Sequence, residues 1–278
     1  MKLTISMAVY EDYNGLLFST QALRMYQNLP KDTEFLIFDN CPDSDDGRQT
    51  EKFINNFVPT GRYIPVKDRQ SSFVKYDFAH HATGDVVLGL DSHVLLQTGA
   101  IDALMSWWSE HQGEAHNLTG PLLYDGFNAV STHMEPAWRG SDYGTWATDN
   151  EKMKLGQPFE VPLQGMGLFS VWRTAFKPVN VPFKSFGGEE SYFAERTRQQ
   201  GGKTICHPAI GWWHRFDWPK RRPFPNAMKE KVANYYRGWL DLYGHLEHPM
   251  IQEMTDHWRK TVTEEELVWA ISSALQSR

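Results

Sequence analysis

The 278-residue sequence lacks several features that assign a protein to a class at once. Its only cysteines are Cys41 and Cys206, which excludes a disulfide framework and a zinc site built from cysteines. No apolar run approaches the roughly 20 residues that span a bilayer. The opening MKLTISMAVY has no long apolar core and no small-residue cleavage site. We therefore expect no membrane anchor, no secretory signal and residence in the cytosol.

Positive charge is also scarce, because the formal net charge is −6. A protein that coats nucleic acid is normally basic, so this function is disfavoured. After the first apolar run, MAVYEDYNG contains a single glycine, Gly15, which disfavours a nucleotidyltransferase with a glycine-rich phosphate loop. What the sequence does have is eleven tryptophans, which are typical of sugar-stacking surfaces or of plain core packing.

The first half of the sequence alternates between two kinds of apolar pattern. Continuous apolar runs predict strands, and apolar residues at helical spacing predict helices between them. The strands are expected at residues 3–10, 34–39, 63–66 and 85–91. Strands separated by helices indicate βαβ units, so we predict an α/β fold with a mostly parallel sheet.

The second half is less regular. Residues 133–158 are polar, contain several glycines and prolines, and are predicted to form a long functional or mobile loop. From about Pro219 the pattern is helical, and Thr263 with Glu266 three residues later forms a capping box. We therefore predict two parts, a sheet domain over residues 1–218 and a helical extension over residues 219–278.

Polar side chains follow three of the predicted strands: Tyr10-Glu11-Asp12, Asp39-Asn40 and Asp91-Ser92-His93. In open parallel sheets, ligands bind beyond the carboxyl ends of the strands. Asp91 and His93 lie on the same side of an extended chain, so together they can hold a divalent cation such as Mn²⁺. The alternative is that Asp91 caps the following turn and His93 is simply a polar residue.

Two further groups of residues are candidates for chemistry. Gly187-Gly188-Glu189-Glu190 precedes a predicted helix, where two acids interact favourably with the helix dipole. Helix capping explains the acids but not the glycines, which permit a positive φ or close backbone approach. The third group is Trp212-Trp213-His214, in which the histidine is either a ligand or a hydrogen-bonded core residue.

The order of these motifs resembles that of a known family. Asp-Ser-His after a strand is followed by PLQGMGLFSVWRTAF and then by FGGEESYFAERTRQQGGKTICHPAIGWWHRF. This arrangement resembles the GT-A glycosyltransferases, both the family 2 enzymes and the catalytic domain of polypeptide N-acetylgalactosaminyltransferases. The likeness covers residues 3–216. It implies a Rossmann-like, mostly parallel sheet flanked by helices, and it leaves the C-terminal helical extension outside.

The resemblance implies a metal-dependent, hexosyltransferase-like enzyme that moves a sugar from a nucleotide-sugar, usually a UDP-sugar, to an acceptor hydroxyl. Its cofactor would be Mn²⁺ or Mg²⁺, held by Asp91, His93 and His214. Its catalytic acids would be Glu189 and Glu190. The implied donor-binding residues are Ala8, Tyr10, Asp39, Lys75, Ser92, Gly165, Met166, Gly167 and Arg215.

The two branches of the family imply different mechanisms. The family 2 alignment makes Glu190 the base of an inverting reaction, whereas the N-acetylgalactosaminyltransferase alignment makes Glu189 the acidic residue of a retaining one. The sequence also departs from the relatives at Arg215, because they often place an arginine three residues after the late histidine, where this chain has Asp217. The absence of a lectin domain, stem or anchor suggests a bacterial or viral cytosolic enzyme.

The acceptor is less defined by the sequence. Trp146, Trp212 and Trp213 are candidates for an acceptor platform, with plain packing as the alternative. The segment 203–237 has eight basic residues against two acidic ones, a formal charge of +6, while the rest carries −12. This segment is either a solvated face that also neutralises diphosphate or a site for an anionic acceptor, such as viral DNA with hydroxymethylated bases. A non-catalytic module that binds a nucleotide or a glycan is the alternative of another class.

Overall fold

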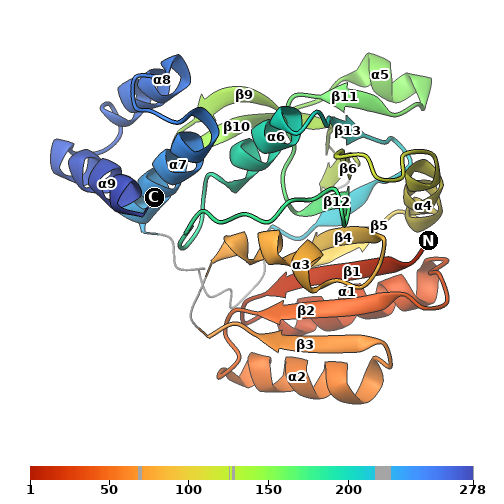
Figure 1. The fold of residues 1–278 in the computed structure, drawn as a ribbon. Helices are drawn as coiled ribbons and strands as arrows, with labels where there is room; N and C mark the ends of the chain where they lie inside the picture. The colour runs from red at the N-terminus through yellow and green to blue at the C-terminus, as the bar shows by residue number, and fades with distance from the viewer. Residues whose placement is uncertain (68–70, 125, 127–128, 217–226, 278) are drawn as a thin grey trace.

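The computed structural model describes residues 1–67, 71–124, 126, 129–216 and 227–277, and it contains a central eight-stranded sheet (Figure 1). Its strand order is β11 (Phe159–Val161), β13 (Thr204–Cys206), β6 (Asn117–Thr119), β12 (Leu168–Trp172), β4 (Val86–Asp91), β1 (Leu3–Val9), β2 (Glu34–Asp39) and β3 (Gly61–Pro65). The four strands from β4 to β3 are parallel, as the alternating apolar patterns predict. The expected α/β class is confirmed.

The alternation of side chains along these strands separates two cores. On one face, Leu3, Ile5 and Met7 pack with α1 (Tyr13–Tyr26), α2 (Asp45–Phe57) and α4 (Ala100–Glu110). On the other face, a second apolar cluster includes residues of the 3₁₀ helix η1 (Ser72–Asp77), α3 (Phe78–His81) and α6 (Glu189–Gln199). A sheet covered on both faces requires the continuous apolar strands that the sequence has.

A smaller sheet brings a late segment back to the end of β4. Its order is β5 (Val94–Leu96), β14 (Trp212–His214), β7 (Leu122–Tyr124) and β8 (Val130–Ser131). Strand β14 pairs antiparallel with β5, so that His214 lies opposite Val94. Because Val94 directly follows His93, this pairing places the two histidines together.

The expectation of a long loop over residues 133–158 is wrong. These residues form a hairpin of β9 (His133–Arg139) and β10 (Asp142–Ala147), followed by the helix α5 (Asn150–Leu155). The two-residue connection is Gly140-Ser141, and Gly140 has a φ of 59°. Glycine readily adopts the positive φ that such a tight turn requires. The glycines therefore mark a turn within regular structure.

The C-terminal helical extension is confirmed as α7 (Met228–Tyr243), α8 (Pro249–Trp258) and α9 (Glu264–Gln276). These helices enclose a core of their own, against which Trp138 and Tyr143 of the hairpin pack. The capping box at Thr263 begins α9 as predicted. The predicted boundary at Pro219 lies outside the described residues, so the division into two domains stays a prediction. Among the described helices, none combines the length and apolar character needed to cross a membrane.

Candidate active site

A cavity of about 370 Å³ opens at the carboxyl ends of β1 and β4. It collects most of the residues that the sequence singled out, although they come from segments far apart in the chain. The lining includes Ala8, Tyr10, Lys75, Asp91, Ser92, His93, Trp146, Gly165, Met166, Gly167, Glu189, Glu190, Trp212 and His214. The parallel register places Ala8 directly opposite Asp91. This cavity is the candidate active site.

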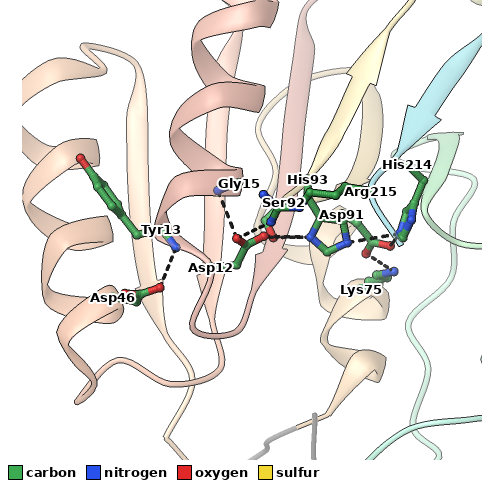
Figure 2. A network of polar contacts seen from close by, with 10 residues as sticks. All are labelled: Asp12, Tyr13, Gly15, Asp46, Lys75, Asp91, Ser92, His93, His214 and Arg215. Carbon is green, nitrogen blue, oxygen red and sulfur yellow. Dashed lines mark hydrogen bonds and ion pairs between the residues drawn. The ribbon is translucent and has the colours of Figure 1, made fainter. Parts of the chain in front are cut away.

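Three potential metal ligands converge in the cavity. One ligand atom from each of Asp91, His93 and His214 lies within 4.8 Å of the others, and in the described part of the chain they form the one such cluster. The Nε2 atoms of the two histidines are 3.2 Å apart, and Nε2 of His214 lies 3.4 Å from Oδ2 of Asp91 (Figure 2). Each of the three side chains is partly buried. The structure thus brings together the set expected from the sequence.

The protonation states of Asp91 and His214 suit a cation, and Lys75 already pairs with one oxygen of the carboxylate. Nζ of Lys75 lies 2.6 Å from Oδ1 of Asp91 and donates to the carbonyl of Met166 at 2.9 Å. Burial would raise the pKa of Asp91, but Lys75 and His214 hold it well below its usual range. Burial lowers the pKa of His214, and the attraction of Asp91 offsets this only in part. An ionised carboxylate and a neutral imidazole are the protonation states that bind metal.

One oxygen and two imidazole nitrogens form a donor set that fits Mn²⁺ and related divalent ions. Asp91, His93 and His214 each bring one ligand atom close to the other two. The residues present therefore fit the divalent cation that the resemblance implies. Asp91, His93 and His214 would hold it.

Asp12 is a residue of the site that the sequence argument noticed only as part of a strand-end group. Its carboxylate is 5% exposed and lies 2.9 Å from Nδ1 of His93. It also caps α1 by accepting from the backbone of Gly15. Burial raises the pKa of Asp12, but His93 and Arg215 together lower it by more, so the net shift is downward. Its position just after the first predicted strand was the sequence signal that could have identified Asp12 as a site residue.

The two adjacent glutamates have different surroundings. Glu189 is 2% exposed, and its Oε2 accepts from the backbone N–H of Gly187 at 2.8 Å. Glu190 is partly exposed to the cavity, and no other residue of the described chain donates a hydrogen bond to its carboxylate. Burial and the charge of Glu189 raise the pKa of Glu190 to about 8. Gly187 and Gly188 have positive φ, as predicted, and place the pair at the start of α6.

The side of the cavity facing the strands was foreseen only in part, through Trp146. The hairpin contributes Arg139, Asp142 and Tyr143, and α7 contributes Tyr235. The hydroxyl of Tyr235 accepts from the backbone N–H of Tyr143 at 2.8 Å and so joins the hairpin to the helix. Residues of a hairpin and of a distant helix carry no shared sequence signal, and the hairpin itself was taken for a loop.

Three predicted site residues lie away from this cavity. Asp39 is buried, with one oxygen accepting from the backbone of Cys41 and the other from the hydroxyl of Tyr63. Trp213 and Arg215 line a second cavity of about 490 Å³ beside α1 and β5. Arg215 pairs with Asp12 at 2.7 Å. The functional roles assigned to these three stay predictions.

The basic segment 203–237 is not simply a solvated face. Lys231 and Arg237 are both 3% exposed, and they pair with Asp142 and Glu230 respectively. Lys203 pairs with Glu160 at the surface. The segment also includes Asp217, Lys220, Arg221 and Arg222, which lie outside the described residues. Much of the described positive charge is therefore balanced within the chain.

Comparison with known proteins agrees with this architecture. No protein-family model matches the chain. Mouse polypeptide N-acetylgalactosaminyltransferase 4 is 27% identical over an alignment of 183 positions, which covers 59% of this chain and 30% of that protein. The chain thus spans less than a third of the length of this curated relative.

Solved structures share the fold at low identity. GalNAc-T7 with UDP, GalNAc and Mn²⁺ gives a TM-score of 0.66 at 14% identity, covering all of this chain and 58% of that one. S. aureus TarS 1–349 with UDP-GlcNAc gives 0.60 at 13% identity, covering all of this chain and 81% of that one. The mannosyltransferase PcManGT from Pyrobaculum calidifontis, with GDP-Man and Mn²⁺, gives 0.57 at 13% identity, covering 99% and 73%. The chain has the GT-A fold.

The GT-A fold confirms the resemblance that the order of the motifs indicates. The Asp91-Ser92-His93 turn, the segment around Met166, the acidic pair before α6 and His214 all border one cavity. In this GT-A chain they are brought together by the parallel half of the large sheet and by the return of β14 to β5.

Proposed function

We propose that the protein is a metal-dependent glycosyltransferase that uses a nucleotide-sugar donor. The observation that carries this proposal is the convergence of Asp91, His93 and His214 beside Glu189 and Glu190 in one cavity. Ligands of a divalent cation next to a carboxylate with a raised pKa suit transfer of a sugar from a diphosphate. The GT-A fold and the 27% identity to an N-acetylgalactosaminyltransferase support the same class.

The divalent cation, when bound, offsets the negative charge that develops on the departing nucleoside diphosphate. Lys75 holds the Asp91 carboxylate at 2.6 Å and so keeps its other oxygen toward His214. Ala8 and Tyr10, at the end of β1, line the side of the cavity where a nucleotide would lie. In this reaction the bond between the anomeric carbon and the phosphate oxygen breaks, and a bond from that carbon to the acceptor oxygen forms.

Glu190 is the group we assign to the acceptor proton. Its side chain lines the cavity without a hydrogen bond from another described residue, and the pKa of about 8 makes its ionised form a stronger base than an ordinary carboxylate, so activity should increase as the pH rises toward 8. Glu189 instead anchors the turn through the N–H of Gly187. A base that activates the acceptor for direct displacement implies inversion at the anomeric carbon. Determination of the product anomer by NMR tests this, and retention would favour Glu189 instead.

The donor proposed is a UDP-sugar. Two of the structural neighbours contain UDP or UDP-GlcNAc, whereas the third contains GDP-Man. The acceptor stays undefined. Lys231 and Arg237 are already paired with carboxylates and do not offer a site for an anion, so no observation on the described residues favours nucleic acid. Location in the cytosol stays a prediction from the sequence.

The test is a screen of UDP- and GDP-sugars for slow hydrolysis, with Mn²⁺, with Mg²⁺ or with a chelator. We expect one donor to be hydrolysed, metal addition to stimulate the rate, and His214→Ala to lose at least about 100-fold of it. His245→Ala is the matched control, because that imidazole is 61% exposed and does not line the cavity. Undiminished hydrolysis in chelator would contradict the proposal.

A different result would identify a binding module. If UDP binds tightly in the presence of Mn²⁺ in calorimetry but no donor is turned over, the protein holds nucleotide without catalysis. The screen therefore separates the enzyme from the alternative of another class with the same protein sample.

A further inference from the structure

The carboxylate of Asp12 is where three parts of the molecule meet: helix α1, the turn after β4 and the end of β14 (Figure 2). Its Oδ1 accepts from the backbone N–H of Gly15 at 3.1 Å and from Nη2 of Arg215 at 2.7 Å. Its Oδ2 accepts from the hydroxyl of Ser92 at 3.1 Å and contacts Nδ1 of His93 at 2.9 Å. A carboxylate that four groups hold in this way has a fixed position.

The position of the Asp12 carboxylate decides which nitrogen of His93 is available to bind a metal. An ionised carboxylate only accepts hydrogen bonds, so Nδ1 of the neutral ring carries the proton and Nε2 keeps its lone pair. That Nε2 is the atom that lies 3.2 Å from Nε2 of His214, inside the ligand cluster. We propose that Asp12 is a positioning residue that fixes the tautomer and the orientation of His93 for binding a divalent cation. The inference rests on the proposed function, because it concerns the same metal site.

Gly15 supports this inference independently. A Cβ atom at this position would clash with Oδ2 of Asp12. The backbone φ of Gly15 is not positive. Glycine in a helix is less favourable than alanine, so the backbone conformation alone does not explain its presence. The space beside the carboxylate does. Gly15 therefore leaves room for the carboxylate that contacts His93.

The primary test compares Asp12→Asn with the wild type in two measurements that do not depend on turnover. Asparagine keeps the helix cap, but its amide can donate to Nδ1 and so favours the other tautomer. Calorimetric titration with MnCl₂ should show affinity about 10- to 100-fold weaker. Two-dimensional NMR of the metal-free protein with ¹⁵N-labelled histidine should show His93 changing from the Nδ1–H form to the Nε2–H form.

Two other variants sharpen the result. Gly15→Ala keeps Asp12 but displaces its carboxylate, so we expect Mn²⁺ affinity to fall in the same direction, by roughly tenfold. Asp46→Asn is the matched control. Its carboxylate also accepts from a backbone N–H at the start of α1, that of Tyr13 at 3.1 Å, but Figure 2 shows it away from His93. It should bind Mn²⁺ within about twofold of the wild type.

The outcomes separate the two proposals. If Asp12→Asn binds Mn²⁺ within about twofold of the wild type, or keeps the Nδ1–H tautomer, the assignment of Asp12 is overturned while the proposed function stands. If the wild type binds no Mn²⁺, the metal chemistry of the proposed function fails. The tautomer spectrum, recorded without metal, then still decides whether Asp12 holds His93. Should Asp12→Asn not fold, Gly15→Ala decides in its place by the same two measurements.

Discussion

The two sides of the cavity are built in different ways. One side, the strand wall, consists of Ala8, Tyr10 and the Asp91–His93 turn, and it stands on the core beneath the parallel sheet. The opposite side, the hairpin wall, consists of Arg139, Asp142, Tyr143, Trp146 and Tyr235. In the hairpin wall, Tyr143 and Tyr235 pack with the core of the C-terminal helices, whereas Trp146 packs against the core of the large sheet. The strand wall and the two tyrosines of the hairpin wall thus rest on different apolar clusters.

This difference has a consequence for how substitutions should act. Changes in the strand wall should affect metal and donor binding, because all three metal ligands lie on or beside it. Changes beneath the hairpin wall should affect transfer to the acceptor while leaving metal binding intact. Three predictions, from the largest effect to the smallest, test whether the two walls are separable in this sense.

The largest effect is expected where the walls meet, at the acidic pair. Glu190→Gln should lower kcat by about 10²- to 10⁴-fold, because a general base is lost, while the Kd for donor stays near that of the wild type. Glu189→Gln keeps a carbonyl oxygen for the N–H of Gly187 and should lose about tenfold or less. Steady-state kinetics and calorimetry with donor measure both. If Glu189→Gln is the more damaged variant, the roles of the two acids are exchanged.

The next prediction compares the two cores with one substitution in each. Trp108 and Trp258 are both fully buried, the first in the core of the large sheet and the second among the C-terminal helices. Replacement by alanine should cost about 3–5 kcal/mol of the free energy of unfolding in either case. Trp258→Ala should keep its Mn²⁺ affinity on warming, whereas Trp108→Ala should lose it. Circular dichroism melts and Mn²⁺ titration at several temperatures provide the comparison, and parallel loss in both variants would make the walls one cooperative unit.

The smallest effect concerns pH. The pKa of Glu190 rises from 4.5 to about 8 in the folded protein through burial and the charge of Glu189. The stability linked to this group is therefore fully present below the unfolded pKa and is lost as the pH rises through about 8. Glu190→Gln should melt above the wild type at pH 9, by roughly 2–4 °C per kcal/mol relieved, and close to it at pH 4. An equal difference in Tm at both pH values would show that charge burial is not the cause.

The strand wall was largely predictable from the sequence. The runs ending at Val9, Asp39 and Asp91 have the continuous apolar character of buried parallel strands, and the polar residues after them must meet at one edge. Residue order alone placed Asp91 beside His93. The approach of His214 was inferred from a resemblance, because pairing between β14 and β5 is a long-range event that no local pattern encodes.

The hairpin wall was not predictable in the same way. Gly140-Ser141 between two potential strands is a two-residue hairpin signal, but the prolines and glycines around it suggested a loop. Tyr235 could not be predicted as a site residue from its sequence pattern. It packs in the core of the C-terminal helices, bonds to the hairpin and also lines the cavity. Asp39 also lies at a strand end, where one of its oxygens accepts from the hydroxyl of Tyr63, and its role in donor binding stays a prediction.

The long separation between His93 and His214 has an implication for synthesis of the protein. The parallel strands and their helices emerge first from the ribosome, carrying Asp91 and His93, while the third ligand follows 121 residues later. At about 5–20 residues per second, roughly 6–24 s separate the synthesis of His93 from that of His214. Under the proposed function, the three-residue metal site would therefore be complete only after β14 has paired with β5 and β7 in the smaller sheet.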